Sequence, residues 1–181
     1  MSRHVHQHPR RAACSCGQVA FELSREPIMT VSCQCQSCQT AGAHFAATGT
    51  STLDDYAGTP VVMFRKDRVR CIAGSERLAD YRLSPDAPTR RVVAACCNTP
   101  MFLEFEKGHW LSIYRDRLPV GDRPPVELRT MTADQPPHIE LPDDVPNLSH
   151  HSARFMWRLL AAWVAMGFRT PPMARILRDA A

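Results

Sequence analysis

Three cysteines lie within six residues in the motif Cys33-Gln34-Cys35-Gln36-Ser37-Cys38. Two further cysteine pairs stand before and after this motif: Cys14 with Cys16, and Cys96 with Cys97. Seven of the eight cysteines therefore fall into three tight groups. Soft thiolates on tight turns are ligands that zinc prefers. The spacing predicts metal binding at more than one place in the chain.

Cys33, Cys35 and Cys38 are close enough in sequence to bind one metal ion together. Three protein ligands with an open fourth position are typical of catalytic zinc, where a thiol, water or carbonyl oxygen can bind. We therefore treat these three cysteines as candidate metal-binding and catalytic residues. Two other interpretations stay open, redox-active thiols or a second structural site that another residue closes.

Cys14 and Cys16 need a second pair of ligands, since two thiols cannot complete a structural zinc site. Residues i and i+2 of a strand lie on one side, so both thiols can face one ion. The downstream pair is the expected partner, and Cys97 is its firmer member because Asn98 tolerates the left-handed turn that follows. Cys96 needs a local bulge to point toward the same ion.

The remaining candidates have weaker signals. Cys71 stands alone in an apolar run and is predicted to be a buried structural cysteine. His44 follows Cys38 by six residues and could act as a ligand or as an acid or base, although a structural histidine is the commoner outcome. His4, His6 and His8 fall in a polar segment that is predicted to be a flexible tail.

Short alternating or apolar runs dominate residues 13–118, which predicts a mainly β domain. A charged turn, residues 65–68, is predicted to close a hairpin between the strands at 61–64 and 69–73. The other expected strands are residues 17–24, 29–32, 42–48, 78–83, 90–95, 101–105 and 110–114.

The remainder of the chain is organised differently. Residues 1–12 form the predicted tail, and residues 119–146 hold seven of the fifteen prolines, which predicts a linker or a peripheral wrap. Residues 147–181 are predicted to be helical, with Asn147 or Ser149 as the N-cap of a helix that runs to Phe168. That helix is apolar on most sides but too short to cross a bilayer. It is expected to dock on the β domain and form a homodimer contact; a position in a membrane surface is the alternative.

Composition limits the function classes. A net charge of +4, from 22 basic and 18 acidic residues, gives only weak support for nucleic-acid binding, and none is expected. The first thirteen residues are polar and basic, without the apolar stretch of a signal peptide. A cytoplasmic location is therefore predicted, where reduced cysteines bind metals instead of forming disulfides.

With these residues in place, the chain resembles the glutathione-dependent formaldehyde-activating enzyme family, which shares its domain with centromere protein V. The resemblance covers residues 14 to about 115. It rests on Cys14-Ser15-Cys16-Gly17-Gln18-Val19-Ala20-Phe21, on Cys33 to Cys38 followed by Gly42-Ala43-His44-Phe45, and on Cys97-Asn98-Thr99-Pro100-Met101-Phe102.

The resemblance implies a β-tent fold of short antiparallel strands with up to two zinc ions. One zinc would be structural, held by Cys14, Cys16 and the downstream cysteines; the other would be catalytic, held by Cys33, Cys35 and Cys38. The implied activity is that of a carbon–sulfur lyase, in which glutathione or another thiol forms an adduct with an aldehyde.

The chain departs from the family pattern at two places. The family usually has CxxCG downstream, whereas Ala94 occupies the first cysteine position here and Asn98 replaces the glycine. The segment after residue 119 also has no counterpart in the motif, which suggests a divergent subgroup. The alternative to an enzyme is a zinc-stabilised scaffold whose apolar C-terminal helix binds a partner.

Overall fold

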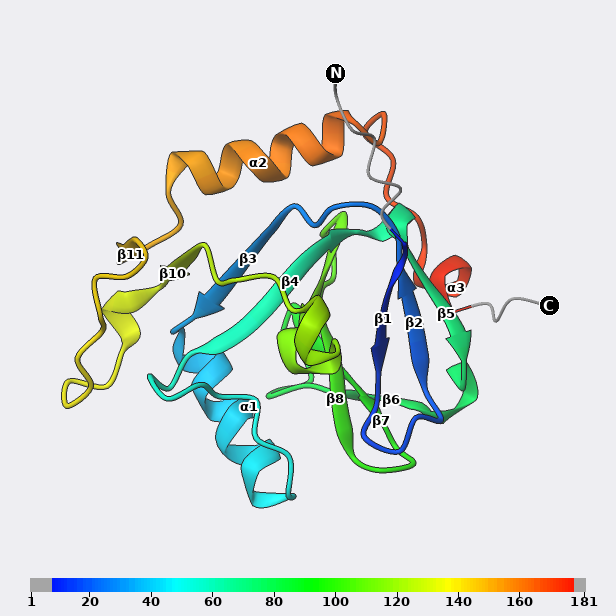
Figure 1. Cartoon of the computed structure of the whole chain (residues 1–181), viewed down its shortest axis with the longest axis horizontal. Coiled ribbons are helices and arrows are strands. Elements are labelled where there is room, and N and C mark those ends of the chain that lie inside the picture. The colour runs from blue at the N-terminus through cyan, green and yellow to red at the C-terminus, as the bar shows by residue number, and fades with distance from the viewer. Residues whose placement is uncertain (1–7, 178–181) are drawn as a thin grey trace.

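The computed structural model describes residues 8–177, and most of its regular elements are strands arranged in two sheets (Figure 1). The small sheet has the order β1 (Arg10–Ala13), β2 (Ala20–Leu23) and β5 (Val69–Ala73). The large sheet has the order β11 (Asn147–Leu148), β10 (Leu128–Thr130), β3 (Met29–Cys33), β4 (Thr59–Arg65), β9 (Trp110–Tyr114), β8 (Thr99–Phe105), β7 (Thr89–Ala94) and β6 (Leu78–Tyr81). The predicted mainly β fold is confirmed.

Helices are few and short. The α-helices are α1 (Gln36–Ala47), α2 (Ala153–Val164) and α3 (Met173–Ile176). Single 3₁₀ turns cover Lys66–Arg68, Ser75–Arg77, Arg115–Arg117, Val120–Asp122 and Thr132–Asp134. No helix in residues 8–177 is long and apolar enough to span a bilayer.

Strand β4 lies at the centre of the molecule and is buried on both faces. Val62 and Phe64 pack with the small sheet in one core, whereas Val61 and Met63 contribute to a second core on the opposite face. Side chains alternate between the faces of a strand, so a strand with two buried faces must be continuously apolar. The run Val61 to Phe64 meets that requirement. The second core includes residues of α1 and α2.

Helix α1 corrects the prediction of a strand at residues 42–48. Cys35 is the N-cap, and the backbone N–H groups of Cys38 and Gln39 donate to its carbonyl oxygen at 2.9 Å and 3.1 Å. The segment from Ala41 to Ala47 contains four alanines, and alanine has the highest helix propensity. Cys38, Ala41 and Phe45 are buried on one face of the helix, at helical spacing. The apolar composition of the segment alone did not show this spacing.

The predicted hairpin at residues 61–73 is also wrong. Strand β4 pairs with β3 and β9, whereas β5 pairs with β2 in the other sheet, so the chain crosses between sheets at Lys66–Arg68. Lys66 in this turn is buried, and its Nζ lies 2.5 Å from a carboxylate oxygen of Glu104. A buried ammonium group needs such a partner. Glu104 is distant from Lys66 in the sequence, so the local sequence could not reveal this ion pair.

The segment after residue 118 wraps one edge of the large sheet. Within it, β10 runs parallel to β3, and β11 runs parallel to β10. Helix α2 begins at Ala153, later than predicted, because the Ser152 hydroxyl accepts a hydrogen bond from the backbone N–H of Phe155 at 3.1 Å. This is an ordinary serine N-cap. Strand β1 begins inside the predicted tail, and His4 and His6 lie outside the described residues.

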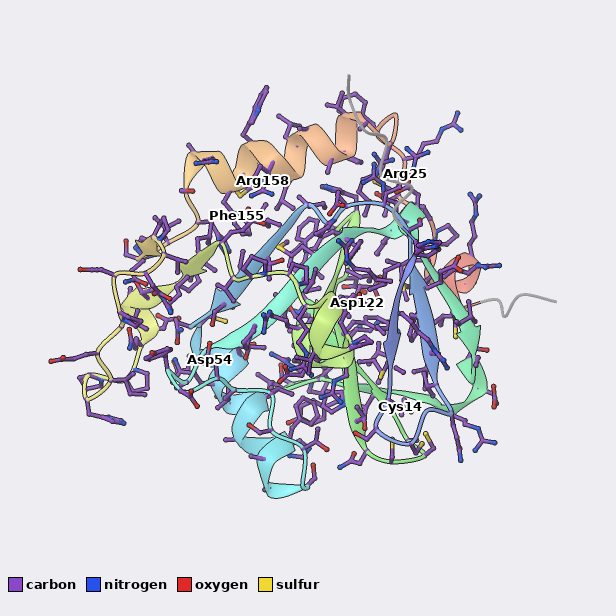
Figure 2. The ribbon with its side chains drawn as sticks, viewed as in Figure 1. Cys14, Arg25, Asp54, Asp122, Phe155 and Arg158 are labelled. Atoms are coloured by element: carbon purple, nitrogen blue, oxygen red, sulfur yellow. The ribbon has the colours of Figure 1, made fainter. Side chains whose placement is uncertain are left out.

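Helix α2 lies across the end of the large sheet near β3 (Figure 1). Phe155 and Leu159 are its buried side chains, and Arg158 donates to the carbonyl oxygen of Ile28 and forms an ion pair with Glu127 (Figure 2). His109 donates a hydrogen bond from Nε2 to the Leu159 carbonyl oxygen at 2.8 Å. The predicted docking of this helix on the β domain is therefore observed.

Candidate functional site

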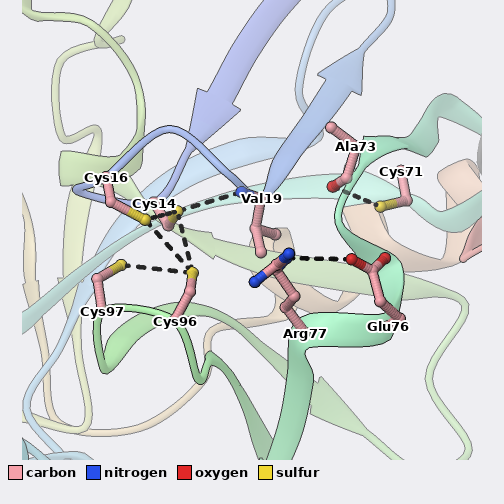
Figure 3. Close-up of polar contacts among 9 residues, drawn as sticks. All are labelled: Cys14, Cys16, Val19, Cys71, Ala73, Glu76, Arg77, Cys96 and Cys97. Carbon is pink, nitrogen blue, oxygen red and sulfur yellow. Dashed lines mark hydrogen bonds and ion pairs between the residues drawn. The ribbon is translucent and has the colours of Figure 1, made fainter.

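Two loops bring four cysteines together at one end of the small sheet (Figure 3). Cys14 and Cys16 lie in the turn between β1 and β2, and Cys96 and Cys97 lie in the turn between β7 and β8. All four Sγ atoms lie within 4.8 Å of one another. The Cys96 Sγ is 3.4 Å from that of Cys16 and 3.9 Å from that of Cys14.

Both pairs lie in turns, which corrects the strand that we expected at Cys14 and Cys16. Gly17 adopts a φ of 77° and its N–H donates to the Cys14 carbonyl, which folds the first pair back on itself. Asn98 has a φ of 52°, as its left-handed role predicts. Cys96 lies beyond the end of β7, in the turn that follows a register shift between Val92 and Val93 in the β7–β8 pairing. Cys96 thus supplies the thiol that the family pattern has at position 94.

The adjacent thiols Cys96 and Cys97 differ in proton affinity. Loss of hydration, together with hydrogen bonds to Cys16 and Cys97, raises the pKa of Cys96 to about 12. Loss of hydration also raises the pKa of Cys97, but the Thr99 hydroxyl, 3.0 Å from its Sγ, and the bonds to Cys16 outweigh this and lower it to about 6. Cys97 therefore loses its proton more readily than its neighbour Cys96. An all-thiol set of four fits a closed zinc site.

Cys33, Cys35 and Cys38 form the second group, with all three Sγ atoms within 4.8 Å of one another. Cys33 ends β3, Cys35 caps α1 and Cys38 is in its first turn. Among residues 8–177, no other cysteine, histidine or carboxylate joins this group. His44 points elsewhere and stacks on Tyr81 with ring centroids 4.4 Å apart. The group is a three-thiol set that could hold a metal ion with one position left for another ligand.

The position of this group at a helix N-terminus favours thiolate. The thiols of Cys33 and Cys38 stabilise the Cys35 thiolate and hold its pKa well below the usual value. The interaction with Cys35, together with burial, raises the pKa of Cys33. Interactions with Cys33 and Cys35, together with burial, raise the pKa of Cys38. The backbone N–H of Cys38 and the dipole of α1 add to the stabilisation of negative charge at Cys35. Cys35 is therefore the thiol of this group that loses its proton most readily.

A cavity of about 380 Å³ opens beside the three thiols. Its walls come from the large sheet, from the first turn of α1 and from α2. Most of its lining is apolar, and the aliphatic and aromatic members include Met63, Leu103, Trp110, Phe155 and Leu159. The residues around the thiol group therefore form a partly enclosed chamber instead of a flat surface.

Arg91 is the one guanidinium group of the cavity lining in the described part of the chain. It is 1% exposed, and its Nη2 donates to the carbonyl oxygen of Ser37 at 2.9 Å and to the Ser37 hydroxyl at 2.8 Å. Within the described part of the chain its Nε and Nη1 have no partner at hydrogen-bond distance, although the guanidinium lies close enough to the buried Tyr114 hydroxyl to oppose the rise in the Tyr114 pKa that burial causes. Ser37 is in the first turn of α1, so Arg91 ties strand β7 to the helix that carries the thiols.

Sequence reasoning missed two lining residues besides the α2 side chains. His151 lines the edge of the cavity, with Nδ1 3.0 Å from the Thr130 hydroxyl and its ring stacked on Phe155. Loss of hydration lowers its pKa, which keeps the ring neutral near pH 7. Arg91 was concealed in a strand with two adjacent arginines. The sequence did not distinguish Arg91 from Arg90, because the two differ only in the face of the strand on which each side chain lies.

Cys71 is fully buried, as predicted.

The part of the chain that holds this site matches the model of a known protein family. The family model described as glutathione-dependent formaldehyde-activating enzyme matches residues 9–115, which is more than half of the chain and includes both cysteine groups. No curated protein matches. Among solved structures, a crystal structure of a Rhodobacter sphaeroides protein is similar at 16% identity with a TM-score of 0.46, covering 64% of this chain and 96% of that protein. By its match to the family model, the chain belongs to the glutathione-dependent formaldehyde-activating enzyme family.

Proposed function

We propose that the protein catalyses carbon–sulfur bond chemistry, the reversible addition of a small thiol to an aldehyde, at Cys33, Cys35 and Cys38. One observation carries the proposal: three clustered thiols that no fourth ligand from residues 8–177 completes, beside a cavity of about 380 Å³. This arrangement leaves both a coordination position and room for a substrate. Membership of the family supports a thiol of the glutathione type as the co-substrate.

The three cysteines would hold zinc through their thiolates. When bound, zinc supplies a Lewis acid that favours the thiolate form of an incoming thiol at neutral pH. The donor set fits this ion, since thiolates are soft ligands and the Cys35 pKa is already low. Because thiols must stay reduced to act in this way, we place the protein in a reducing compartment such as the cytoplasm.

The lining residues have separate tasks in the addition step. The sulfur of the co-substrate forms a bond to the carbonyl carbon, and the π electrons of the C=O bond move to its oxygen. Arg91 can donate from Nε and Nη1 to that oxygen as it becomes negative. The neutral His151 ring can take the thiol proton at Nε2 and return it to the oxygen, so the product is a hydroxyalkyl thioether and no oxidant is needed.

The second zinc would be structural, on Cys14, Cys16, Cys96 and Cys97. Four thiolates complete a tetrahedral site, so no position remains for a substrate. This site joins the β1–β2 turn to the β7–β8 turn and thus clamps the small sheet to the large one.

The test is formation of the adduct by the zinc-loaded protein. Glutathione and formaldehyde are mixed with the protein, and two-dimensional ¹H exchange NMR spectroscopy follows the interconversion of formaldehyde hydrate and S-hydroxymethylglutathione. We expect acceleration over the uncatalysed rate, and loss of it in Cys35→Ser without loss of the folded state. No acceleration by protein that holds zinc at this group would contradict the proposal.

A second candidate function is partner binding through α2. Its outward face leaves large apolar side chains exposed, including Trp157 at 67%, Val164 at 51% and the following Phe168 at 59%. Exposed patches of this kind often mark interaction sites. A homodimer through this face is one form of the proposal, and sedimentation equilibrium tests it. A dimer that Trp157→Ser dissociates would support it, and a monomer at all concentrations would count against it.

A further inference from the structure

The cavity beside the three thiols is partly built by a segment outside the family match. Helix α2 begins at Ala153, well beyond residue 115, and places Phe155, Met156 and Leu159 in the cavity wall. Phe155 and Leu159 are 5% and 4% exposed, so they are fixed parts of the wall. The His109 bond to the Leu159 carbonyl and the Arg158 contacts hold the helix at this position.

The opposite wall is apolar as well. Met63 of β4, Leu103 of β8 and Trp110 of β9 all belong to the core that α2 completes or pack against it. A one-carbon aldehyde would leave these surfaces without contacts. An apolar group of the ligand would instead displace water from them, at a gain of about 0.8 kcal/mol per buried methylene.

Arg91 indicates the polar end of the ligand. Its guanidinium is buried, two of its nitrogens lack partners and no carboxylate forms an ion pair with it among the described residues. Buried donors of this kind need an acceptor. The proposed thiol–aldehyde chemistry supplies such an acceptor, the carbonyl oxygen of the aldehyde.

We propose that this cavity binds carbonyl compounds with an extended apolar group, whose oxygen meets Arg91 and whose apolar chain lies between the sheet and α2. The inference rests on the proposed thiol–aldehyde chemistry and names the aldehyde class. At roughly 30 Å³ per water-sized group, the cavity accommodates about a dozen heavy atoms, which corresponds to aldehydes of about six to eight carbons with room for the thiol sulfur.

Binding of unreactive amides to the zinc-loaded protein tests this without any turnover. Formamide, butanamide, hexanamide and octanamide share a carbonyl acceptor and differ in apolar length. Isothermal titration calorimetry should show affinity rising about fourfold per methylene, with an increasingly negative heat-capacity change, until the cavity is full. Equal affinities along the series, or hexanoate binding more tightly than hexanamide, would overturn the proposal.

A matched pair of variants tests whether the apolar part of the ligand lies against α2. Met156 lines the cavity and is 53% exposed, whereas its neighbour Trp157 is 67% exposed and does not line it. Both positions tolerate a charge without loss of the fold because both are at the surface. We expect Met156→Asp to weaken hexanamide binding roughly fivefold to tenfold and to leave formamide unchanged, while Trp157→Asp has neither effect. Equal effects of the two variants would contradict a site under α2.

Activity separates this inference from the function on which it rests. If the protein accelerates adduct formation with hexanal far better than with formaldehyde, both proposals stand. Acceleration with formaldehyde together with no dependence of amide binding on length refutes the apolar substrate class alone. Length-dependent amide binding in a protein that accelerates neither reaction refutes the thiol–aldehyde chemistry but leaves the apolar carbonyl site in place.

Discussion

At the scale of single residues, the chemistry depends on how neighbouring thiols share protons. Cys33, Cys35 and Cys38 have the same side chain, yet their positions at the end of β3, at the N-cap and in the first turn of α1 separate their pKa values. The sequence predicted that the three belong together. It could not rank them, because the ranking depends on burial and on which sulfur the others face.

This ranking predicts selective alkylation in the metal-free protein. With its pKa held low by Cys33 and Cys38, Cys35 stays a thiolate as pH falls from 8 to about 5, whereas Cys33 and Cys38 stay protonated throughout. Iodoacetamide at pH 6, followed by peptide mass spectrometry, should label Cys35 before the other two. The fully buried Cys71 serves as the control for the folded state. Equal labelling of the three would contradict the assignment.

Glu104 is a second residue whose effect can be predicted. Its carboxylate lies 2.5 Å from the Lys66 Nζ and 2.6 Å from the Arg90 Nε, and both Glu104 and Lys66 are buried. Glu104→Ala leaves the ammonium group unpaired and should reduce the free energy of unfolding by about 3–5 kcal/mol in urea titrations. The matched change at the exposed Glu22–Arg70 pair, Glu22→Ala, should cost less than about 1 kcal/mol. Similar losses in both variants would refute the buried-pair interpretation.

At the scale of elements, sequence patterns located the strands better than they assigned their partners. The runs at 61–64, 69–73, 101–105 and 110–114 all became strands because alternation or continuous apolarity reports burial of a strand directly. The pairing of β5 with β2 depends on contacts between distant segments. Helix α1 was mistaken for a strand because small apolar residues satisfy both periods, and its alanines were the signal that favoured the helix.

The turn at Asn98 gives a prediction at this scale. Its φ of 52° is accessible to asparagine and glycine but strained for a β-branched residue. Asn98→Val should displace Cys97 and weaken zinc binding by the four-thiol group, whereas Asn98→Gly should preserve it. A competition titration with a chromophoric zinc chelator measures both. Equal zinc affinity in the two variants would show that this backbone geometry does not position the ligand.

At the scale of the whole molecule, the proposed function assigns one thiol group to the stability of the fold and the other to the chemistry. One group joins the two sheets, and the other lies between the large sheet, α1 and the cavity that α2 covers. The sequence predicted the membership of both groups, since clustered cysteines and a turn-forming asparagine are local signals. The contributions of Arg91, His151 and α2 could not be predicted, because residues 60 to more than 100 positions apart meet there only through the tertiary fold.

The central claim is that Cys33, Cys35 and Cys38 hold a zinc ion with a position open to an external thiol. Anomalous diffraction at the zinc edge from zinc-loaded crystals, with and without glutathione, tests it most directly. We predict one zinc bound by four cysteine sulfurs at Cys14, Cys16, Cys96 and Cys97, and a second bound by three, whose fourth ligand becomes the glutathione sulfur. A second zinc that is missing, or that a fourth protein side chain completes, would contradict the account.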